Sequence, residues 1–284
     1  MQGQPDQAAA PRELPLYILV CVKQVPDTAE IKIDPVTHAL LREDVPGIVN
    51  PFDVYALEMA ARIKDRDSAV KIAVLSMGPS QARRALRQCL ALGADEAYLA
   101  SDRAFSGSDT LATSYVLSKA IEWIQKGQGP FDLILCGRQA IDGDTAQAGP
   151  ELAQRLGYPH ITCVKEILFT GGGMQVTRET QSALEIWESS LPAVVTVARP
   201  EFEPRCPSIG AKLAANRAAV RVLTMQEIEA RPELCGLRGS PTAVKKTFTP
   251  QPKAACAVIR EENPRLAAAQ LAPLLMGLPP GGPP

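Results

Sequence analysis

The sequence predicts an α/β fold built on a parallel β-sheet, with an antiparallel hairpin insertion and an extended C-terminal arm. Continuous apolar runs of strand length alternate with helical patterns through the first half of the chain. Such runs are typical of parallel strands that are covered on both faces. Strands and helices that alternate in this way form right-handed crossovers, which place the strands side by side in one sheet.

The alternating elements can be located along the first half of the chain. Buried strands are predicted at residues 16–22, 71–76 and 131–136. Helices are predicted at 50–64, 80–92 and 108–126. The first helix has Asn50 as its N-cap and Pro51 at its first position, and the later two end at Gly93 and Gly127.

The alternation breaks after residue 159, where antiparallel patterns begin. Strands are predicted at 162–169, 174–180 and 183–188, followed by a buried strand at 193–198. We expect the hairpin strands to form an insertion at one edge of the sheet.

The chain is expected to divide into three parts. Residues 1–15 are predicted as a disordered tail, and residues 16–220 as a nucleotide-binding α/β domain. Residues 221–284 are predicted as an arm that packs on a partner subunit, because Pro, Arg and Lys are frequent and little apolar surface is available for a core. Only 221–230 and 264–276 are expected to be ordered in that arm.

Composition excludes several function classes. Thirty basic and 31 acidic residues give a net charge of −1, which disfavours nucleic acid as a partner. No apolar run approaches the roughly 20 residues that span a bilayer, and the N-terminus does not resemble a secretory signal. We therefore expect a cytoplasmic protein that is not an integral membrane protein.

The chain offers little for metal or nucleophilic chemistry. Its seven cysteines contain no CxxC pair, and the two closest, Cys235 and Cys256, lie 21 positions apart. Two histidines are too few for a histidine-based metal site or a Ser-His-Asp triad. No catalytic or metal-binding residue is predicted, so a bound cofactor must carry any redox chemistry.

Polar segments follow the predicted parallel strands, at the sheet edge where such folds bind ligands. The longest runs from Gly137 to Ala148 and leads towards a helix, whose N-terminus would suit a phosphate. Arg138 could pair with a phosphate oxygen, and Asp142, Asp144, Thr145 and Gln147 could bind ribose or adenine. A solvated loop of Asx-turns with a Thr cap is the alternative. The sequence has no GxGxxG or GxxxxGK[ST] motif, so neither an ordinary dinucleotide site nor a Walker-type NTPase is supported.

Several motifs in one register resemble beta subunits of electron-transfer flavoproteins, from about Leu16 to Pro250. They are Val20–Thr28, Asn50–Asp53, Gly93–Asp95, the Gly137–Gln147 loop, Leu191–Thr196 and Gly239–Thr242. The resemblance implies a Rossmann-like sheet of the adenine-nucleotide-binding type. It also implies a heterodimer with an alpha subunit that carries FAD.

Two types of beta subunit exist in that family. Ordinary members hold AMP as a structural ligand, whereas electron-bifurcating members hold a second FAD, with its AMP half in the same pocket. The forms of Pro26–Thr28, Asp34–Thr37, Ser106–Thr113 and the Gly137–Asp144 loop resemble the bifurcating and nitrogen-fixation-associated branch. This branch implies FAD as cofactor, NADH as electron donor, and NADH-oxidising activity only within the heterodimer.

The resemblance also assigns residues to the site. The nucleotide should contact Cys21, Lys23, Asn50, Asp53, Met77, Gly137, Arg138, Gln139, Ala140, Ile141, Asp142, Gly143, Asp144, Thr145, Ala146, Gln147 and Ala148. Thr110 and Thr113 should lie near the second flavin ring; alternatively, they cap their helix and face solvent.

The segment Glu203–Gly210 resembles the loop that docks acyl-CoA dehydrogenases, which implies such an enzyme, or a quinone reductase, as redox partner. Arg205 and Ile209 are its candidate docking residues, with Ile209 where the family usually has an anchoring Leu. The alternative for Ile209 is an ordinary exposed loop residue. Two further functions stay open: a beta subunit with structural AMP, and a stand-alone adenine-nucleotide-binding or hydrolysing protein.

Overall fold

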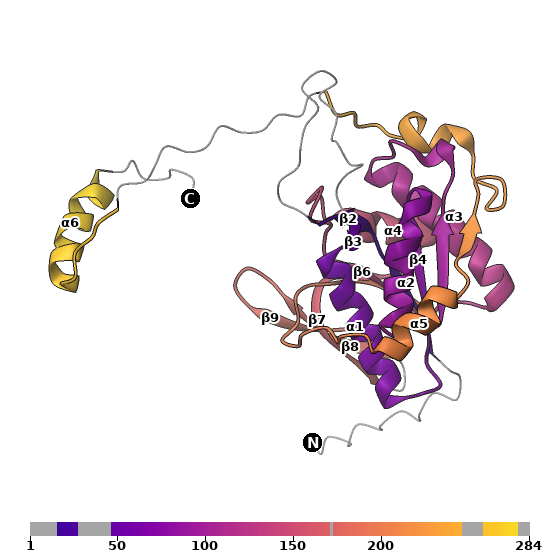
Figure 1. Ribbon diagram of the computed structural model, residues 1–284, viewed down its shortest axis with the longest axis horizontal. Helices are drawn as coiled ribbons and strands as arrows, with labels where there is room; N and C mark the ends of the chain where they lie inside the picture. Colours follow the sequence, from indigo (N-terminus) through magenta and orange to yellow (C-terminus); the bar gives the residue numbers. More distant parts are fainter. Residues whose placement is uncertain (1–15, 28–46, 171–172, 246–257, 278–284) are drawn as a thin grey trace, which may run out of the picture. The chain divides into compact units, whose positions relative to one another are not determined.

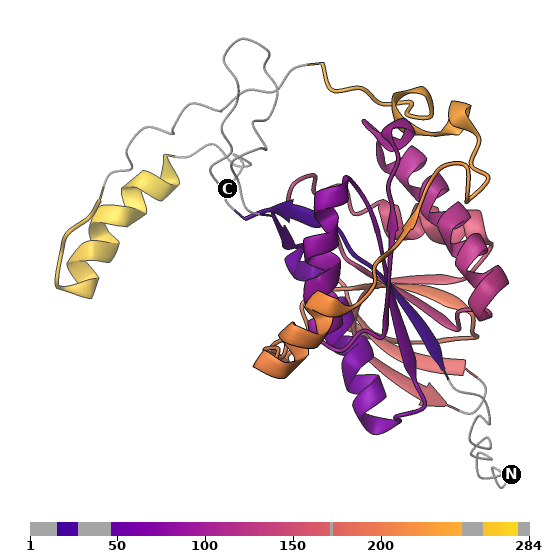
Figure 2. The same ribbon diagram turned by 45° about the vertical axis from the view of Figure 1, so that its right-hand side comes forward.

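The predicted parallel strands lie side by side in one sheet of the computed structural model (Figure 1, Figure 2), which describes residues 16–27, 47–170, 173–245 and 258–277. The strand order in this nine-stranded sheet is β11-β5-β4-β1-β6-β10-β7-β8-β9. Neighbouring strands from β11 to β7 are parallel, and β8 and β9 continue the sheet in antiparallel pairing. The predicted fold class is thereby confirmed, including the hairpins at one edge.

The elements have the following bounds. The strands are β1 (Tyr17–Cys21), β2 (Gln24–Pro26), β3 (Gly47–Val49), β4 (Lys71–Met77), β5 (Glu96–Ala100), β6 (Leu133–Gly137), β7 (His160–Thr170), β8 (Gly173–Glu179), β9 (Leu184–Ser189), β10 (Ala193–Val197) and β11 (Arg221–Leu223). The α-helices are α1 (Pro51–Arg66), α2 (Arg83–Ala91), α3 (Thr110–Gln128), α4 (Ala148–Leu156), α5 (Ile209–Arg217) and α6 (Pro264–Met276). Short 3₁₀ turns are η1 (Ser80–Ala82), η2 (Arg103–Phe105), η3 (Pro232–Leu234) and η4 (Gly236–Arg238).

Helices cover both faces of the sheet, which explains the continuous apolar strands. Successive residues of β1 point to opposite faces, so Ile18 and Val20 pack with α1 and α2, whereas Leu19 packs with α3 and α4. All five residues of β1 are buried. Because each face of β1 is covered, a polar residue at any of these positions would lose its contact with water.

Four strands of the structure are absent from the predicted set. Two of them are β5 and β11, which are parallel neighbours at the other edge of the sheet. The other two are β2 and β3, which form a short antiparallel pair. These elements are short or begin with charged or polar residues, so their apolar pattern is weak.

The boundary predicted between residues 220 and 221 is wrong for the described structure. The strand β11 starts at Arg221 and pairs with β5, and the first compact unit continues to Lys245. Residues after β11 therefore belong to the domain. The predicted disordered tail, 1–15, lies outside the described residues.

The second unit, Lys246–Pro284, contains α6, which coincides with the segment 264–276 that was predicted to be ordered. Asn263 caps this helix by accepting a hydrogen bond from the backbone N–H of Arg265, and Pro264 occupies the first turn. Its packing on a partner subunit stays a prediction. No helix in the described parts of the chain is long and apolar enough to cross a membrane.

The segment from Gly236 to Thr242, here called the clasp, fixes the start of α3. Ser240 Oγ accepts a hydrogen bond from the backbone N–H of Asp109 at 2.8 Å, and Thr242 Oγ1 donates one to the Asp109 carboxylate at 2.8 Å. Gly236 has φ +58°, and a Cβ there would lie 2.4 Å from the carbonyl oxygen of Ala104. The clasp therefore requires glycine at this position.

We predict that Gly236→Ala lowers the free energy of unfolding by roughly 2 kcal/mol or more, through left-handed strain and the clash with the Ala104 carbonyl. Gly127→Ala is the control, because Gly127 lies inside α3 and a Cβ there meets nothing within 4 Å. The control should gain roughly 0.5–1 kcal/mol. Urea unfolding measures both values, and equal effects of the two substitutions would contradict the prediction.

Candidate nucleotide site

The predicted site lies where two central strands end side by side. The strands β1 and β6 are parallel neighbours, and Cys21 at the end of β1 is paired with Cys136 in β6. The chain continues from β6 through the segment Gly137–Ala148, called here the 137–148 loop, into α4. This is the carboxyl edge of the sheet, where open α/β folds bind ligands.

A buried carboxylate holds the ends of both strands. Asp53, in the first turn of α1, accepts hydrogen bonds from the backbone N–H of Lys23 at 2.7 Å and of Gly137 at 3.1 Å. Burial raises the pKa of Asp53 from its ordinary 3.8 to about 7, while the hydrogen bonds from Asn50, Lys23 and Gly137 oppose the rise. A Cβ on Gly137 would lie 2.3 Å from the Asp53 carboxylate, so only glycine permits this approach.

Asn50 fastens the base of the 137–148 loop. Its side-chain amide donates to the carbonyl oxygen of Gln139 at 2.8 Å, and its amide oxygen accepts from the N–H of Ile141 at 3.2 Å. It also donates to Asp53 at 3.0 Å. Asn50 is the residue before α1, as predicted, but its side chain makes no capping hydrogen bond.

The structure shows protein partners for the side chains of Asn50 and Asp53, and their contact with a nucleotide stays a prediction. Both side chains are buried and bonded to protein groups. They hold the base of the loop through these hydrogen bonds, which the sequence pattern alone did not predict.

The outer half of the loop is open to ligands. Every residue from Ile141 to Gln147 is exposed, and Asp144 and Ala146 have left-handed backbones with φ of 49° and 54°. Lys23 forms an ion pair with Asp142 at 2.6 Å, and Asp144 accepts a hydrogen bond from Gln139 at 2.9 Å. Left-handed conformations of residues with a Cβ are strained and are frequent at ligand-binding sites.

The residues of the 137–148 loop fall into two groups according to how exposed they are. Gly137, Gln139, Ala140 and Ala148 are partly buried, whereas Arg138 is exposed, with its guanidinium carbon 5.9 Å from the centre of the Phe52 ring. Exposed residues on the outer half are Ile141, Asp142, Gly143, Asp144, Thr145, Ala146 and Gln147. The loop thus presents a cation and several carboxylate and amide groups on a firm base.

Cys21, Cys136 and Met77 form the apolar part of the strand ends. A hydrogen bond with Cys21, together with burial, raises the pKa of Cys136 well above its ordinary range. The Cys136 thiol therefore stays protonated and acts as a small apolar group. Met77, at the end of β4, is partly buried against the α3 side of the sheet.

The structure brings the start of α3 to the end of the loop. Thr110 Oγ1 lies 3.1 Å from Glu151 Oε1 in the first turn of α4 and 3.5 Å from Gln147 Oε1. Thr113 lies one turn further along α3 and is also partly buried. The alternative that these threonines cap the helix is wrong, because Asp109 is the cap and accepts from the N–H of Ala112. Glu151 was not predicted as a site residue, although it closely follows the loop in the sequence.

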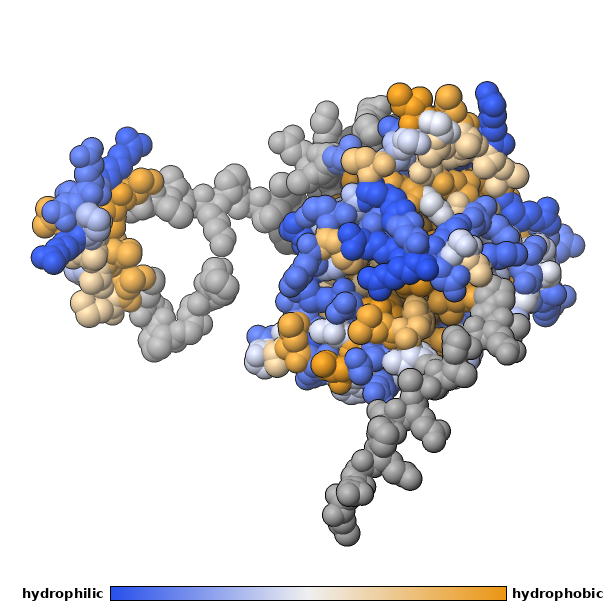
Figure 3. Space-filling model, turned by 90° about the horizontal axis from the view of Figure 1, so that it is seen from below, coloured by the Kyte–Doolittle hydropathy of each residue, from blue (hydrophilic) through white to orange (hydrophobic). Residues whose placement is uncertain are grey.

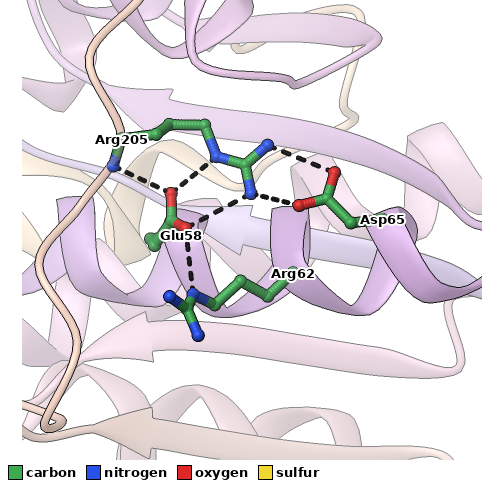
Figure 4. A network of polar contacts seen from close by, with 4 residues as sticks. All are labelled: Glu58, Arg62, Asp65 and Arg205. Atoms are coloured by element: carbon green, nitrogen blue, oxygen red, sulfur yellow. Dashed lines mark hydrogen bonds and ion pairs between the residues drawn. The ribbon is translucent and has the colours of Figure 1, made fainter.

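The segment that resembles a docking loop is held on α1 by a network of charges (Figure 4). The guanidinium of Arg205 contacts Glu58 at 2.7 Å and Asp65 at 2.6 Å, and Glu58 also accepts a hydrogen bond from Arg62 at 3.2 Å. Hydrogen bonds to Glu58 and Asp65 raise the pKa of Arg205 above its ordinary range. Arg205 therefore fixes this segment within the chain.

Ile209 is 80% exposed, as an anchoring residue requires. The expectation that it lies in a loop is wrong, because it is the first residue of α5. Ser208 starts this helix, since its Oγ accepts a hydrogen bond from the N–H of Ala211 at 3.1 Å.

A metal site has no support in the described ranges, where no group of three or more His, Cys, Asp or Glu side chains could hold an ion.

Comparisons with known proteins identify relatives over most of the chain. Residues 37–228 match the model of the electron transfer flavoprotein domain family. The chain is 49% identical over 250 residues to the electron transfer flavoprotein subunit beta of Megasphaera elsdenii. The aligned region covers 87% of this chain and 93% of the relative. It is 47% identical to the caffeyl-CoA reductase-Etf complex subunit CarD of Acetobacterium woodii, with coverage of 84% and 89%. It is 42% identical to protein FixA of Azotobacter vinelandii, with coverage of 91% and 94%.

We predict that the contribution of Asp53 to folding stability falls as the pH rises. Because the folded chain holds the Asp53 proton more tightly than the unfolded chain, the stabilisation is complete below about pH 3.8 and is lost towards about pH 7. The difference in unfolding free energy between wild type and Asp53→Asn should fall by up to about 1.4 kcal/mol per pH unit within this window.

Urea unfolding at several pH values measures this difference. Asp67→Asn is the control, since Asp67 is an exposed carboxylate that accepts a hydrogen bond from the N–H of Ala69. A difference between wild type and Asp53→Asn that rises with pH would show that the folded state prefers the charged form.

Proposed function

The chain belongs to the electron transfer flavoprotein family as a beta subunit, and from this we propose that it binds FAD and passes electrons from NADH towards the FAD of an alpha subunit by flavin-based bifurcation. The observation that carries the proposal is the 137–148 loop, with its buried base and its exposed polar rim at the carboxyl edge of the sheet. Enzymatic oxidation of NADH would then occur only in the heterodimer.

The residues present fit the AMP half of the cofactor. Arg138, Lys23 and the N-terminus of α4 offer positive charge and N–H donors for phosphate oxygens. Asp142, Asp144 and Gln147 offer acceptors and an amide for ribose and adenine. When bound, the flavin would supply hydride acceptance and one-electron transfer, while the protein would supply binding and orientation.

Two observations favour FAD over AMP alone. Thr110 places a further polar group beside the end of the loop, and Thr113 lies one turn further along α3, so a nucleotide larger than AMP could reach this helix start. Relatives also include a subunit of the caffeyl-CoA reductase-Etf complex and FixA proteins. A beta subunit with structural AMP is the second candidate, and it would use the same loop without the threonines.

A stand-alone nucleotide-binding or hydrolysing protein is the third candidate, and the surface argues against it. Leu184, Ile186 and Trp187 on the edge strand β9 are 61%, 69% and 47% exposed. Figure 3 shows one face of the molecule, where hydrophobic side chains lie at the surface among hydrophilic ones. Exposed apolar side chains on an edge strand are expected to be covered in an assembly. A heterodimer with the alpha subunit provides such a cover.

The redox partner beyond the heterodimer is proposed to be an acyl-CoA dehydrogenase-like enzyme or a quinone reductase. The support is the exposed Ile209 at the start of α5, on a segment that Arg205 holds in place. An aliphatic side chain fixed on a firm base suits a pocket in a partner protein.

The decisive test of cofactor content is to reconstitute the heterodimer with excess FAD, count the flavins and titrate with NADH without oxygen. We predict two FAD molecules per dimer and reduction by NADH. Asp144→Ala should lower the nucleotide content, whereas Asp67→Asn, outside the site, should leave it unchanged. One FAD with one AMP would support the structural-AMP candidate, and two flavins that NADH does not reduce would exclude the proposed donor.

Docking is tested with Ile209→Ala in the heterodimer. We predict that the rate of electron transfer at limiting concentration of the partner dehydrogenase falls, since truncation of an anchor costs roughly 1–3 kcal/mol of binding. Flavin content and reduction by NADH should not change. Val244→Ala is the control, because Val244 is also an exposed aliphatic residue, at 83%. Equal rates for both variants would rule out the anchor.

A further inference from the structure

The hydroxyl of Thr110 lies close to two hydrogen-bond acceptors. Its oxygen lies 3.1 Å from Glu151 Oε1 and 3.5 Å from Gln147 Oε1. A hydroxyl group has one proton to donate and two lone pairs that accept. If the carboxylate takes the proton, the Thr110 oxygen has only lone pairs left for any further partner.

Glu151 is held in an environment that is costly for a carboxylate. Its Oε2 is buried and has no hydrogen-bond partner among the described residues. Burial raises the pKa of Glu151, and the negative charge of Asp109 adds to this, whereas Thr110 and Arg155 oppose it. A buried polar atom without a partner destabilises the fold, so its presence calls for a specific role.

Among the described residues, the Thr110 hydroxyl is the one group that donates a hydrogen bond to the Glu151 side chain. Arg155, one turn along α4, instead donates to the hydroxyl of Ser114 at 2.8 Å and to the carbonyl oxygen of Leu111 at 2.9 Å. The clasp holds Asp109 at the start of α3, and the bonds from Arg155 tie this part of α3 to α4. The contact between Thr110 and Glu151 therefore joins the first turn of α3 to the first turn of α4.

We propose that Glu151 is a positioning residue that holds Thr110 Oγ1 as a hydrogen-bond acceptor towards the nucleotide on the 137–148 loop. The ligand group that faces Thr110 is then an N–H or O–H donor. Thr110 is partly buried, so part of its surface remains exposed to solvent. This inference rests on the proposed function, in that the ligand is an adenine nucleotide.

A double-mutant cycle in the heterodimer tests the coupling. The variants are Thr110→Val, Glu151→Leu and the combination of both, and the probes are FAD and AMP added to nucleotide-depleted protein. Each single substitution should weaken binding of one probe about 3- to 10-fold, which corresponds to one hydrogen bond. The double variant should bind no more weakly than the weaker single variant, since both changes remove the same contact.

Two controls separate this role from a purely structural one. Glu151→Gln should bind the probe nearly as tightly as the wild type, because its amide oxygen still accepts the Thr110 proton. Glu122→Leu changes a carboxylate elsewhere on the α3 surface, where Glu122 pairs with Lys119, and should not affect binding. Melting temperatures without nucleotide report any damage to the fold itself.

Each outcome decides the inference. Coupling with FAD alone places Thr110 beside the part of the ligand beyond AMP, and coupling with AMP places it beside the AMP half; both support the role of Glu151. Independent, multiplying effects with both probes would overturn it, as would unchanged binding in Glu151→Leu. A wild-type heterodimer that takes AMP but no second FAD would refute the bifurcating function alone, and the AMP cycle would still test Glu151.

Discussion

The buried carboxylate of Asp53 is the constraint on which the geometry of the candidate site depends. It joins three segments that are distant in the sequence: the end of β1, the start of α1 and the end of β6. Two backbone N–H groups at the strand ends would otherwise lack these partners, and Gly137 leaves just enough space for the carboxylate. The exposed rim of the loop can carry strained residues because this base is fixed.

A second constraint acts at the other side of the loop. The clasp binds Asp109, the cap of α3, and the next residue, Thr110, contacts Glu151 and Gln147. The Gly239–Thr242 motif therefore has a structural explanation that does not require contact with a ligand. Its serine and threonine position a helix end, and a Cβ on Gly239 would lie 2.1 Å from the backbone of Leu234.

The fold could be predicted where burial alone determines the pattern. The apolar strands β1, β4, β6 and β10 are covered on both faces, so their sequences are continuous apolar runs. The edge strand β11 has three residues and begins with Arg221, so no such pattern marks it. The glycines and aspartates of the 137–148 segment predicted a loop, and the structure shows one between β6 and α4, whose binding of a nucleotide stays a prediction. The roles of Asn50, Asp53 and Arg205 could not be predicted, because each depends on a partner far away in the sequence.

The helix α1 links the two segments to which we assign function. Asp53, near its start, holds the 137–148 loop, and Glu58, little more than one turn later, holds Arg205 of the segment Glu203–Gly210. Both carboxylates are buried, so each depends on its partner: removing Arg205 would leave the Glu58 charge inside the protein without its main compensation. A shift of α1 would therefore disturb the loop and the segment Glu203–Gly210 together. The 137–148 loop and the segment Glu203–Gly210 differ in their side chains, but both are held by carboxylates of one helix, α1.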